Sequence, residues 1–208
     1  MKNKQPSTIV GISGGSGSGK TYIAKRLTKK YQKGFINLIY QDSFYKDLSH
    51  LTLEQRAEKN FDNPKAIDFA LLIQVIKTLS LGDPAQIPIY DFTKHIRTNN
   101  FIDLKPSPII VLDGTLIYTQ PKLLELIDLK IFIDAPDKLR LSRRIKRDTD
   151  ERGRTPNSIM TQYSKSVRPM FDQFVAPTAK YADIIVDSNK HEIDHTGLIK
   201  NEIDKNLN

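Results

Sequence analysis

One glycine-rich segment, residues 14–21, constrains what this chain can fold into more than any other feature. It reads Gly-Gly-Ser-Gly-Ser-Gly-Lys-Thr and matches the pattern G-x-x-x-x-G-K-[ST] at every fixed position. A short apolar run at 8–13 precedes it, and apolar side chains follow at helical spacing, namely Ile23, Ala24, Leu27 and Tyr31. The order of strand, glycine-rich loop and helix is typical of a fold that binds nucleotide phosphates at the N-terminus of the helix.

The residues of this loop have separate expected roles. The glycines let backbone N–H groups curl around an anion, Lys20 can reach the outer phosphates, and the Thr21 hydroxyl is placed to bind Mg²⁺. A flexible Gly/Ser turn is the alternative, but the lysine, the hydroxyl and the flanking elements all agree with phosphate binding. We therefore predict a nucleotide site formed by Gly14, Gly15, Ser16, Gly17, Ser18, Gly19, Lys20 and Thr21.

Strand and helix patterns alternate along the rest of the chain. Strands are predicted at 35–40, 87–90, 109–112, 131–133 and 184–186, and helices at 52–59, 68–81 and 123–127. The first of these helices opens with the capping-box spacing of Thr52 and Gln55, and four apolar residues near the C-terminus could line a last helix: Ile193, Leu198, Ile199 and Ile203. This alternation predicts an α/β phosphate-loop fold with a mostly parallel five-stranded sheet and helices on both faces.

Composition sets the class of the protein. The 208 residues suit one domain spanning 1–208, and no repeat or linker marks a boundary. The chain has no cysteine, its first seven residues are polar, and no apolar run reaches the length of a membrane span. We expect a cytoplasmic protein without a membrane partner.

The net charge of +8 is concentrated in one segment. Residues 138–154 carry eight Lys/Arg against three acids, a surplus of five, which leaves three charges for the other 191 residues. A diffuse surface for nucleic acid is therefore disfavoured, and a basic segment that closes on a small phosphorylated ligand is favoured. A solvated helix face is the alternative.

Within this basic segment, Arg140, Arg144 and Arg147 share one helix face by their spacing. Leu141 and Ile145 lie on another face, which we expect to pack against the protein while the arginine face reaches outward. The helical pattern fades at 151–154, where two arginines flank a glycine. Because guanidinium groups clamp phosphates with paired hydrogen bonds, the segment is interpreted as a lid.

Two carboxylates follow predicted strands. Asp42 comes just after the strand at 35–40, and Asp113 ends the apolar run that starts at Ile109. In open parallel sheets, ligands bind beyond the carboxyl ends of the strands, so both acids are expected at the nucleotide site, with Asp113 organising Mg²⁺. Either acid could instead cap a helix or form a turn.

The chain resembles the uridine kinase (uridine-cytidine kinase) family of phosphate-loop nucleoside kinases over residues 9–186. The resemblance rests on the phosphate loop and on a series of ordered blocks: Gln-Asp-Ser-Phe-Tyr at 41–45, Phe-Asp-Asn-Pro at 61–64, Ile-Pro-Ile-Tyr-Asp-Phe at 87–92 with His95 and Arg97, Arg-Arg-Ile-Lys-Arg-Asp at 143–148, Glu-Arg-Gly-Arg at 151–154, Gln-Tyr at 162–163, Val-Arg-Pro-Met at 167–170 and Lys-Tyr-Ala-Asp-Ile-Ile at 180–185. Many ordered blocks are far more specific than one loop.

The resemblance implies ATP-dependent phosphorylation of the 5′-hydroxyl of uridine and cytidine in pyrimidine salvage. The phosphoryl donor would be ATP or GTP, the metal would be Mg²⁺, and the assembly would be a homotetramer. It also implies a small β-rich nucleoside-binding insertion at about 84–104 and a lid at about 138–158. Position by position, Asp42 would accept the proton of the 5′-hydroxyl, and Asp62 and Arg144 would hold the ribose hydroxyls. Tyr90 and His95 would recognise the base. The remaining implied residues are Arg154 and Gln162 in the nucleoside pocket, Lys20, Arg147 and Arg152 at the triphosphate, and Thr21, Asp113 and Asp42 at the metal.

Some of these residues have simpler interpretations without the resemblance. Tyr90 in an apolar strand is more often a core residue, His95 more often a surface residue, and Asp62 more often part of a turn. The chain also departs from the family: Asp113-Gly114 stands where relatives usually have Glu-Gly, and residues 187–191 replace the stretch that covers the adenine, so His191 is left out of the site.

Rival functions make different demands on the sequence. A kinase for a phosphosugar or a pantothenate-like alcohol would lack the Tyr-Asp-Phe block with His95, and a phosphosugar would need further anion contacts. A GTPase switch would show Asn-Lys-x-Asp after Asp-x-x-Gly, whereas here Asn-Lys-His-Glu at 189–192 ends in the wrong acid and precedes Asp-His-Thr-Gly at 194–197.

Overall fold

The core of the protein is a five-stranded parallel sheet. The structure is a computed structural model, and it describes residues 7–190 and 193–207. The strands lie in the order β2-β5-β1-β6-β7, and all four pairings are parallel. Their bounds are Thr8–Gly14 (β1), Ile36–Tyr40 (β2), Ile109–Asp113 (β5), Leu129–Asp134 (β6) and Ile184–Asp187 (β7). The central strands are almost wholly buried, because helices cover both faces of the sheet.

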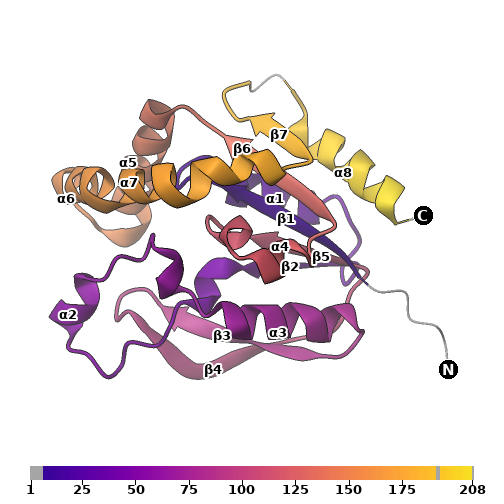
Figure 1. Cartoon of the computed structure of the whole chain (residues 1–208), viewed down its shortest axis with the longest axis horizontal. Coiled ribbons are helices and arrows are strands. Elements are labelled where there is room, and N and C mark those ends of the chain that lie inside the picture. The colour runs from indigo at the N-terminus through magenta and orange to yellow at the C-terminus, as the bar shows by residue number, and fades with distance from the viewer. Residues whose placement is uncertain (1–6, 191–192, 208) are drawn as a thin grey trace.

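Two apolar layers hold helices against the sheet. On one face, α1 (Lys20–Thr28) and α8 (His195–Asn206) contribute Ile23, Leu27, Ile199 and Ile203 to a core with β1, β5 and β6. On the other face, α3 (Phe69–Ser80) and α4 (Pro121–Leu124) pack a second core. Figure 1 places α8 and α3 on opposite sides of the sheet. The predicted α/β phosphate-loop fold is confirmed.

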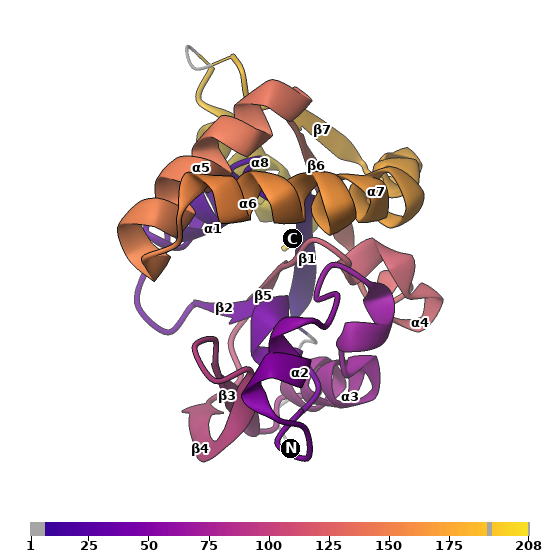
Figure 2. The same cartoon turned by 90° about the vertical axis from the view of Figure 1, so that its left-hand side faces the viewer.

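A long helical run follows the sheet strand β6. It comprises α5 (Asp137–Arg152), α6 (Pro156–Gln162) and α7 (Arg168–Met170), with π-helical turns at Tyr163–Val167 and Phe171–Val175 and a 3-10 segment at Ala176–Tyr181. The prediction covered only the first part of this run. In Figure 2 this run crosses the upper part of the molecule, and α2 (Leu53–Ala57) and the hairpin described next lie below it. No helix in the described part of the chain is both long and apolar enough to span a bilayer.

A two-stranded antiparallel sheet, β3 (Ala85–Asp91) and β4 (Ile96–Leu104), stands apart from the main sheet. The residue pattern predicted most of β3 and no strand at β4, although the β-rich insertion that the resemblance implies at about 84–104 spans both strands. All nine β4 residues are half-buried or exposed, and the exposed ones form one continuous run, so the strand has no alternation of buried and exposed positions. Its pairing with β3, rather than its own pattern, makes it a strand.

Several helix predictions are confirmed with shifted ends. The helix at 68–81 is α3, which Asp68 caps by accepting the Leu71 amide, and the capping box of Thr52 and Gln55 is present at α2. The helix at 52–59 is shorter than predicted. The helix predicted at 123–127 is α4 and begins earlier, because Pro121 occupies its first turn. In the last helix Ile199 and Ile203 are buried, whereas Leu198 is exposed and Ile193 lies outside the helix.

Candidate active site

The glycine-rich loop joins β1 to α1 and passes close beneath the arginine helix α5. Gly17 has φ 80°, and a Cβ at this position would lie 2.2 Å from the Arg140 carbonyl oxygen. Gly19, with φ 102°, forms the N-cap of α1. The loop closes on itself when the Ser18 amide donates to the Gly15 carbonyl at 3.0 Å. Only glycine at position 17 allows both the left-handed backbone and the close approach of α5.

Lys20 lies where the predicted donor and acceptor residues converge. Its ammonium lies 3.5 Å from the Gly15 carbonyl oxygen. Loss of solvent lowers the pKa of Lys20, the negative charges of Asp113 and Asp42 raise it, and the positive charges of Arg147 and Arg144 lower it further. The phosphate loop, both strand-end acids and the arginine helix therefore share one electrostatic environment.

Asp113 and Thr21 form a pair of oxygen ligands beside Lys20. The Thr21 hydroxyl donates to Asp113 Oδ2 at 2.6 Å, and the buried Asp113 Oδ1 has no hydrogen-bond partner in the structure. Burial raises the pKa of Asp113, and the charge of Lys20 partly offsets that rise. An unpartnered carboxylate oxygen next to a hydroxyl, at a phosphate loop, fits the oxygen ligands that Mg²⁺ prefers.

Gln41 connects the two segments that carry the strand-end acids Asp42 and Asp113. This buried side chain accepts the Leu116 amide at 2.7 Å, so it links the segment after β2 to the segment after β5. A Cβ at Gly114 would lie 2.4 Å from the Gln41 Cβ, which shows how closely the two segments approach. Asp42 is the next residue, in the 3-10 turn Gln41–Phe44, and its side chain is half-buried. Sequence reasoning placed Gln41 in a motif without giving it this role.

Asp62 and Arg144 influence each other electrostatically. Burial raises the pKa of Asp62, the charge of Arg144 lowers it, and the charge of Asp42 raises it. Arg144 Nη1 donates to Ser16 Oγ at 2.7 Å and Nη2 donates to Gln162 Oε1 at 3.0 Å. Arg144 thus joins the phosphate loop to the segment that carries Gln162.

Tyr90 and His95 belong to an aromatic cluster contributed by the hairpin and two loops. The His95 ring stacks on Phe61 with centroids 4.8 Å apart, and Tyr45 contacts both Phe61 and Tyr90 at 5.3 Å. His95 has φ 53°, and burial lowers its pKa. Tyr90 is buried, as its simpler interpretation requires, but its hydroxyl has no hydrogen-bond partner in the structure. The aromatic residues at 45 and 61 were quoted in motifs but not assigned to the site.

The arginine face of α5 points inward, so the expectation that it reaches outward is wrong. Arg140 and Arg144 are 4% and 7% exposed, whereas Leu141 and Ile145 are only half-buried. The Arg140 guanidinium lies 3.7 Å from the centroid of the Phe171 ring. These guanidinium groups can be buried because an aromatic ring and a hydroxyl of other elements, together with the carboxylates of Asp137 and Asp148 on α5 itself, interact with them.

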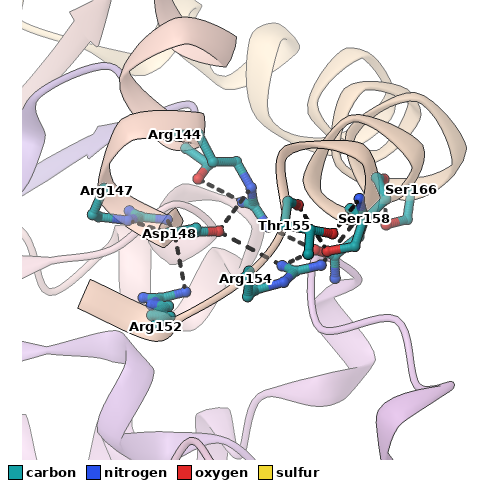
Figure 3. Close-up of polar contacts among 10 residues, drawn as sticks. Arg144, Arg147, Asp148, Arg152, Arg154, Thr155, Ser158 and Ser166 are labelled. Atoms are coloured by element: carbon teal, nitrogen blue, oxygen red, sulfur yellow. Dashed lines mark hydrogen bonds and ion pairs between the residues drawn. The ribbon is translucent and has the colours of Figure 1, made fainter. Parts of the chain in front are cut away.

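Arg147, Arg152 and Arg154 surround Asp148, which the sequence analysis quoted in the 143–148 block without giving it a role. Arg147 donates Nε and Nη2 to its carboxylate at 2.8 and 2.7 Å, and Arg154 also donates to Gln162 at 2.6 Å (Figure 3). The sequence could have indicated these ion pairs, because Arg144 and Arg152 lie four residues before and after Asp148, a spacing that brings side chains together on one helix face.

Three comparisons relate the chain to known proteins. The profile of the family described as Phosphoribulokinase / Uridine kinase family matches residues 9–193. A uridine kinase of Streptococcus agalactiae serotype V is 41% identical over 200 residues, which cover 96% of each chain, and a uridine kinase of Staphylococcus aureus is 44% identical over 191 residues, covering 90% and 92%. The solved structure of phosphoribulokinase from Rhodobacter spheroides superposes with a TM-score of 0.64 at 16% identity, covering 92% of this chain and 76% of that one.

Proposed function

Because the chain belongs to the phosphoribulokinase/uridine kinase family, we propose that it transfers the γ-phosphoryl group of ATP or GTP to the 5′-hydroxyl of uridine and cytidine, giving UMP and CMP for pyrimidine salvage. The observation that carries the proposal is the electrostatic environment of Lys20. This ammonium donates to the Gly15 carbonyl of the phosphate loop, which would grip a donor, and the charge of Asp42, which would orient an acceptor, raises its pKa. Direct transfer requires the two reactants to meet in this way.

The chain's own residues account for the steps of the transfer. Asp42 accepts the proton of the 5′-hydroxyl and aims that oxygen at the γ-phosphorus. Lys20, Arg147 and Arg152 neutralise charge on the phosphoryl group as it moves. Thr21 and Asp113, with Asp42 as a third ligand, would hold Mg²⁺, which supplies charge neutralisation and orientation of the outer phosphates.

Acceptor selection depends on the second half of the site. Asp62 and Arg144 hold the ribose 2′- and 3′-hydroxyls, so a deoxyribose would leave buried polar groups unpaired. Tyr90 and His95 recognise the pyrimidine, and Arg154 and Gln162 complete the pocket. The aromatic cluster around Tyr45 and Phe61 supports this assignment, since it offers ring faces and an unpartnered hydroxyl for a flat base.

The donor base is proposed to lie in a groove of about 550 Å³ beside the N-terminus of α1. The groove is lined by residues that include Ser18, Gly19, Tyr22, Arg26, Arg143 and Asp194. Arg143 donates to the Ser18 carbonyl at 3.1 Å and to Ser188 Oγ at 3.0 Å, so it bridges the phosphate loop and the segment after β7. His191, which the sequence analysis left out of the site, lies outside the described residues.

The broader organisation is also proposed. The chain forms one catalytic domain, 1–208, in which residues of about 84–104 form the nucleoside-binding insertion and residues of about 138–158 form the lid. The resemblance implies a homotetramer, and the absence of cysteine suits a cytoplasmic location. Light scattering of the purified protein measures the assembly, and a monomeric mass would contradict the tetramer.

A substrate panel tests the function. Product formation is measured with ATP or GTP and Mg²⁺ against uridine, cytidine, 2′-deoxyuridine, adenosine, pantothenate and ribulose 5-phosphate. We expect turnover of uridine and cytidine, weak turnover of the deoxynucleoside, and none of the last three. Phosphorylation of pantothenate or ribulose 5-phosphate without uridine would overturn the proposal.

The role of Asp42 has its own test. Asp42→Asn should lower kcat by about 10²–10⁴, the usual contribution of a positioned proton acceptor, while ATP still binds. Asp83→Asn is the matched control, because Asp83 is an exposed acid in the loop between α3 and β3. Near-normal turnover of Asp42→Asn would remove this residue from the mechanism.

A further inference from the structure

Asp148 is a completely buried carboxylate surrounded by arginines. It lies on α5, its exposed fraction is 0%, and four guanidinium groups approach within 4 Å (Figure 3). The distances to its oxygens are 2.7 Å from Arg147, 3.5 Å from Arg144, 3.5 Å from Arg152 and 3.6 Å from Arg154. One negative charge therefore gathers four positive charges that would otherwise repel each other.

The backbone of Asp148 shapes the same region. Its carbonyl accepts the amide of Gly153, the left-handed residue that ends α5, and the amide of Arg154 at 3.1 Å. The chain therefore turns back at this point, and Arg154, beyond the helix, returns to the Asp148 carboxylate, which Arg152 approaches as the last residue of α5. The side chain of Asp148 contacts both Arg152 and Arg154, and its carbonyl also holds the turn that brings Arg154 back.

The arginines held by Asp148 also contact the rest of the site. Arg144 donates to Ser16 in the phosphate loop, and both Arg144 and Arg154 donate to Gln162. The Arg152 guanidinium lies 5.9 Å from the centroid of the Phe92 ring in the hairpin. Asp148 is enclosed by these side chains, so it reaches the reactants only through them.

We propose that Asp148 is a positioning residue for phosphoryl transfer, which sets the orientation of the arginines that neutralise the triphosphate. The proposal rests on the proposed function. Arg147 uses Nε and Nη2 for Asp148, which leaves its Nη1 to donate to a phosphate oxygen. The cluster carries four positive charges against one negative charge, so a polyanion adds to it without displacing Asp148.

Asp148→Asn tests the proposal, because it keeps the shape of the side chain and removes its charge. We expect kcat for uridine to fall roughly 10²-fold, as for a misplacement of about 1 Å in a catalytic group. The Kd for ATP should stay within about 3-fold of wild type or become tighter, because the cluster gains net positive charge. Asp150→Asn is the matched control, since Asp150 is an exposed acid on the same helix.

A double-mutant cycle distinguishes positioning from simple stabilisation. If Asp148 acts through Arg147, then Arg147→Ala combined with Asp148→Asn should lower kcat little more than Arg147→Ala alone. Wild-type kcat in Asp148→Asn would overturn the proposal. Equal losses of kcat, ATP affinity and thermal stability, with additive effects in the cycle, would also overturn it, because they would make Asp148 purely structural.

A second variant serves if Asp148→Asn does not fold. Asp148→Glu keeps the charge and moves it by one methylene, so kcat should fall while ATP binding is kept, and unchanged kcat would contradict the proposal. Failure of the wild-type protein to phosphorylate uridine would count against the proposed function. If the wild-type protein phosphorylates uridine and the Asp148 variants do so at the same rate, the result would count only against the role of Asp148.

Discussion

Gly17→Ala is the sharpest test of how the phosphate loop and the arginine helix fit together. A Cβ at Gly17 would lie 2.2 Å from the Arg140 carbonyl oxygen, against an ordinary contact of at least 3.4 Å. The backbone of α5 must therefore move by about 1.2 Å relative to the loop. A displacement of about 1 Å in a catalytic group can cost 10²-fold in rate, so we expect kcat to fall at least about 10²-fold.

The same substitution also strains the backbone, and a matched glycine separates the two effects. Gly34 has φ 84°, close to the 80° of Gly17, but a Cβ there would meet none of the described residues within 4 Å. Both alanine variants should lose about 1–2 kcal/mol from the left-handed conformation, or roughly 2–8 °C of melting temperature. Gly34→Ala should keep wild-type kcat.

The assays are steady-state kinetics with uridine and ATP and thermal unfolding followed by circular dichroism. A Gly17→Ala variant with kcat within about 3-fold of wild type would refute the reasoning, because the arginine helix would then adjust at no catalytic cost. A Gly34→Ala variant that lost activity to the same extent would show that backbone strain, rather than the contact with Arg140, is responsible.

Three further outcomes are expected. Tyr118→Phe should lower the free energy of unfolding, measured in urea titrations, by about 1–3 kcal/mol and leave kcat unchanged. The reason is that the buried Tyr118 hydroxyl donates to the Gly11 carbonyl at 2.7 Å and accepts the Ile131 amide at 2.7 Å. An unchanged free energy of unfolding would contradict this prediction. Burial raises the pKa of Asp62 above its ordinary 3.8, so the uridine KM should rise as the pH falls toward that raised pKa. Asp62→Asn should remove this pH dependence of KM. Because the ionised carboxylate of Asp62 lowers the stability of the folded protein, Asp62→Asn should melt no lower than wild type at pH 8. For Tyr90→Ala or His95→Ala we expect a higher nucleoside KM and weaker preference for pyrimidines, and unchanged discrimination against purine nucleosides would mean that the base is recognised elsewhere.

Local sequence was enough to predict the framework of the protein. The phosphate loop, the apolar strands and the strand-end acids Asp42 and Asp113 could be located because strand and helix periodicities, turn residues and a fixed-spacing motif act over a few residues. Since parallel strands end at one edge of the sheet, the meeting of these acids with Lys20 also followed from the order of the elements.

Tertiary structure decided which side of the arginine helix is buried. The periodicity of α5 showed two faces, and hydropathy alone favoured burying Leu141 and Ile145. The arginine face turns inward instead because partners from elsewhere in the fold meet it. Arg144 donates to Ser16, which is 128 residues away in the sequence, and the Arg140 guanidinium lies over the Phe171 ring.

Contacts between elements, rather than local sequence patterns, also explain the hairpin strand β4 and the need for glycine at position 17. Ile96–Leu104 pairs with β3 although its own pattern is weak, and Gly17 is required because the Arg140 carbonyl of a distant helix passes beside it. Residue type and spacing determine which elements can form and which chemistry they can carry. Contacts between distant segments decide which faces are buried, since the free energy of burying a charged group depends on packing and hydrogen-bond partners that local sequence does not contain.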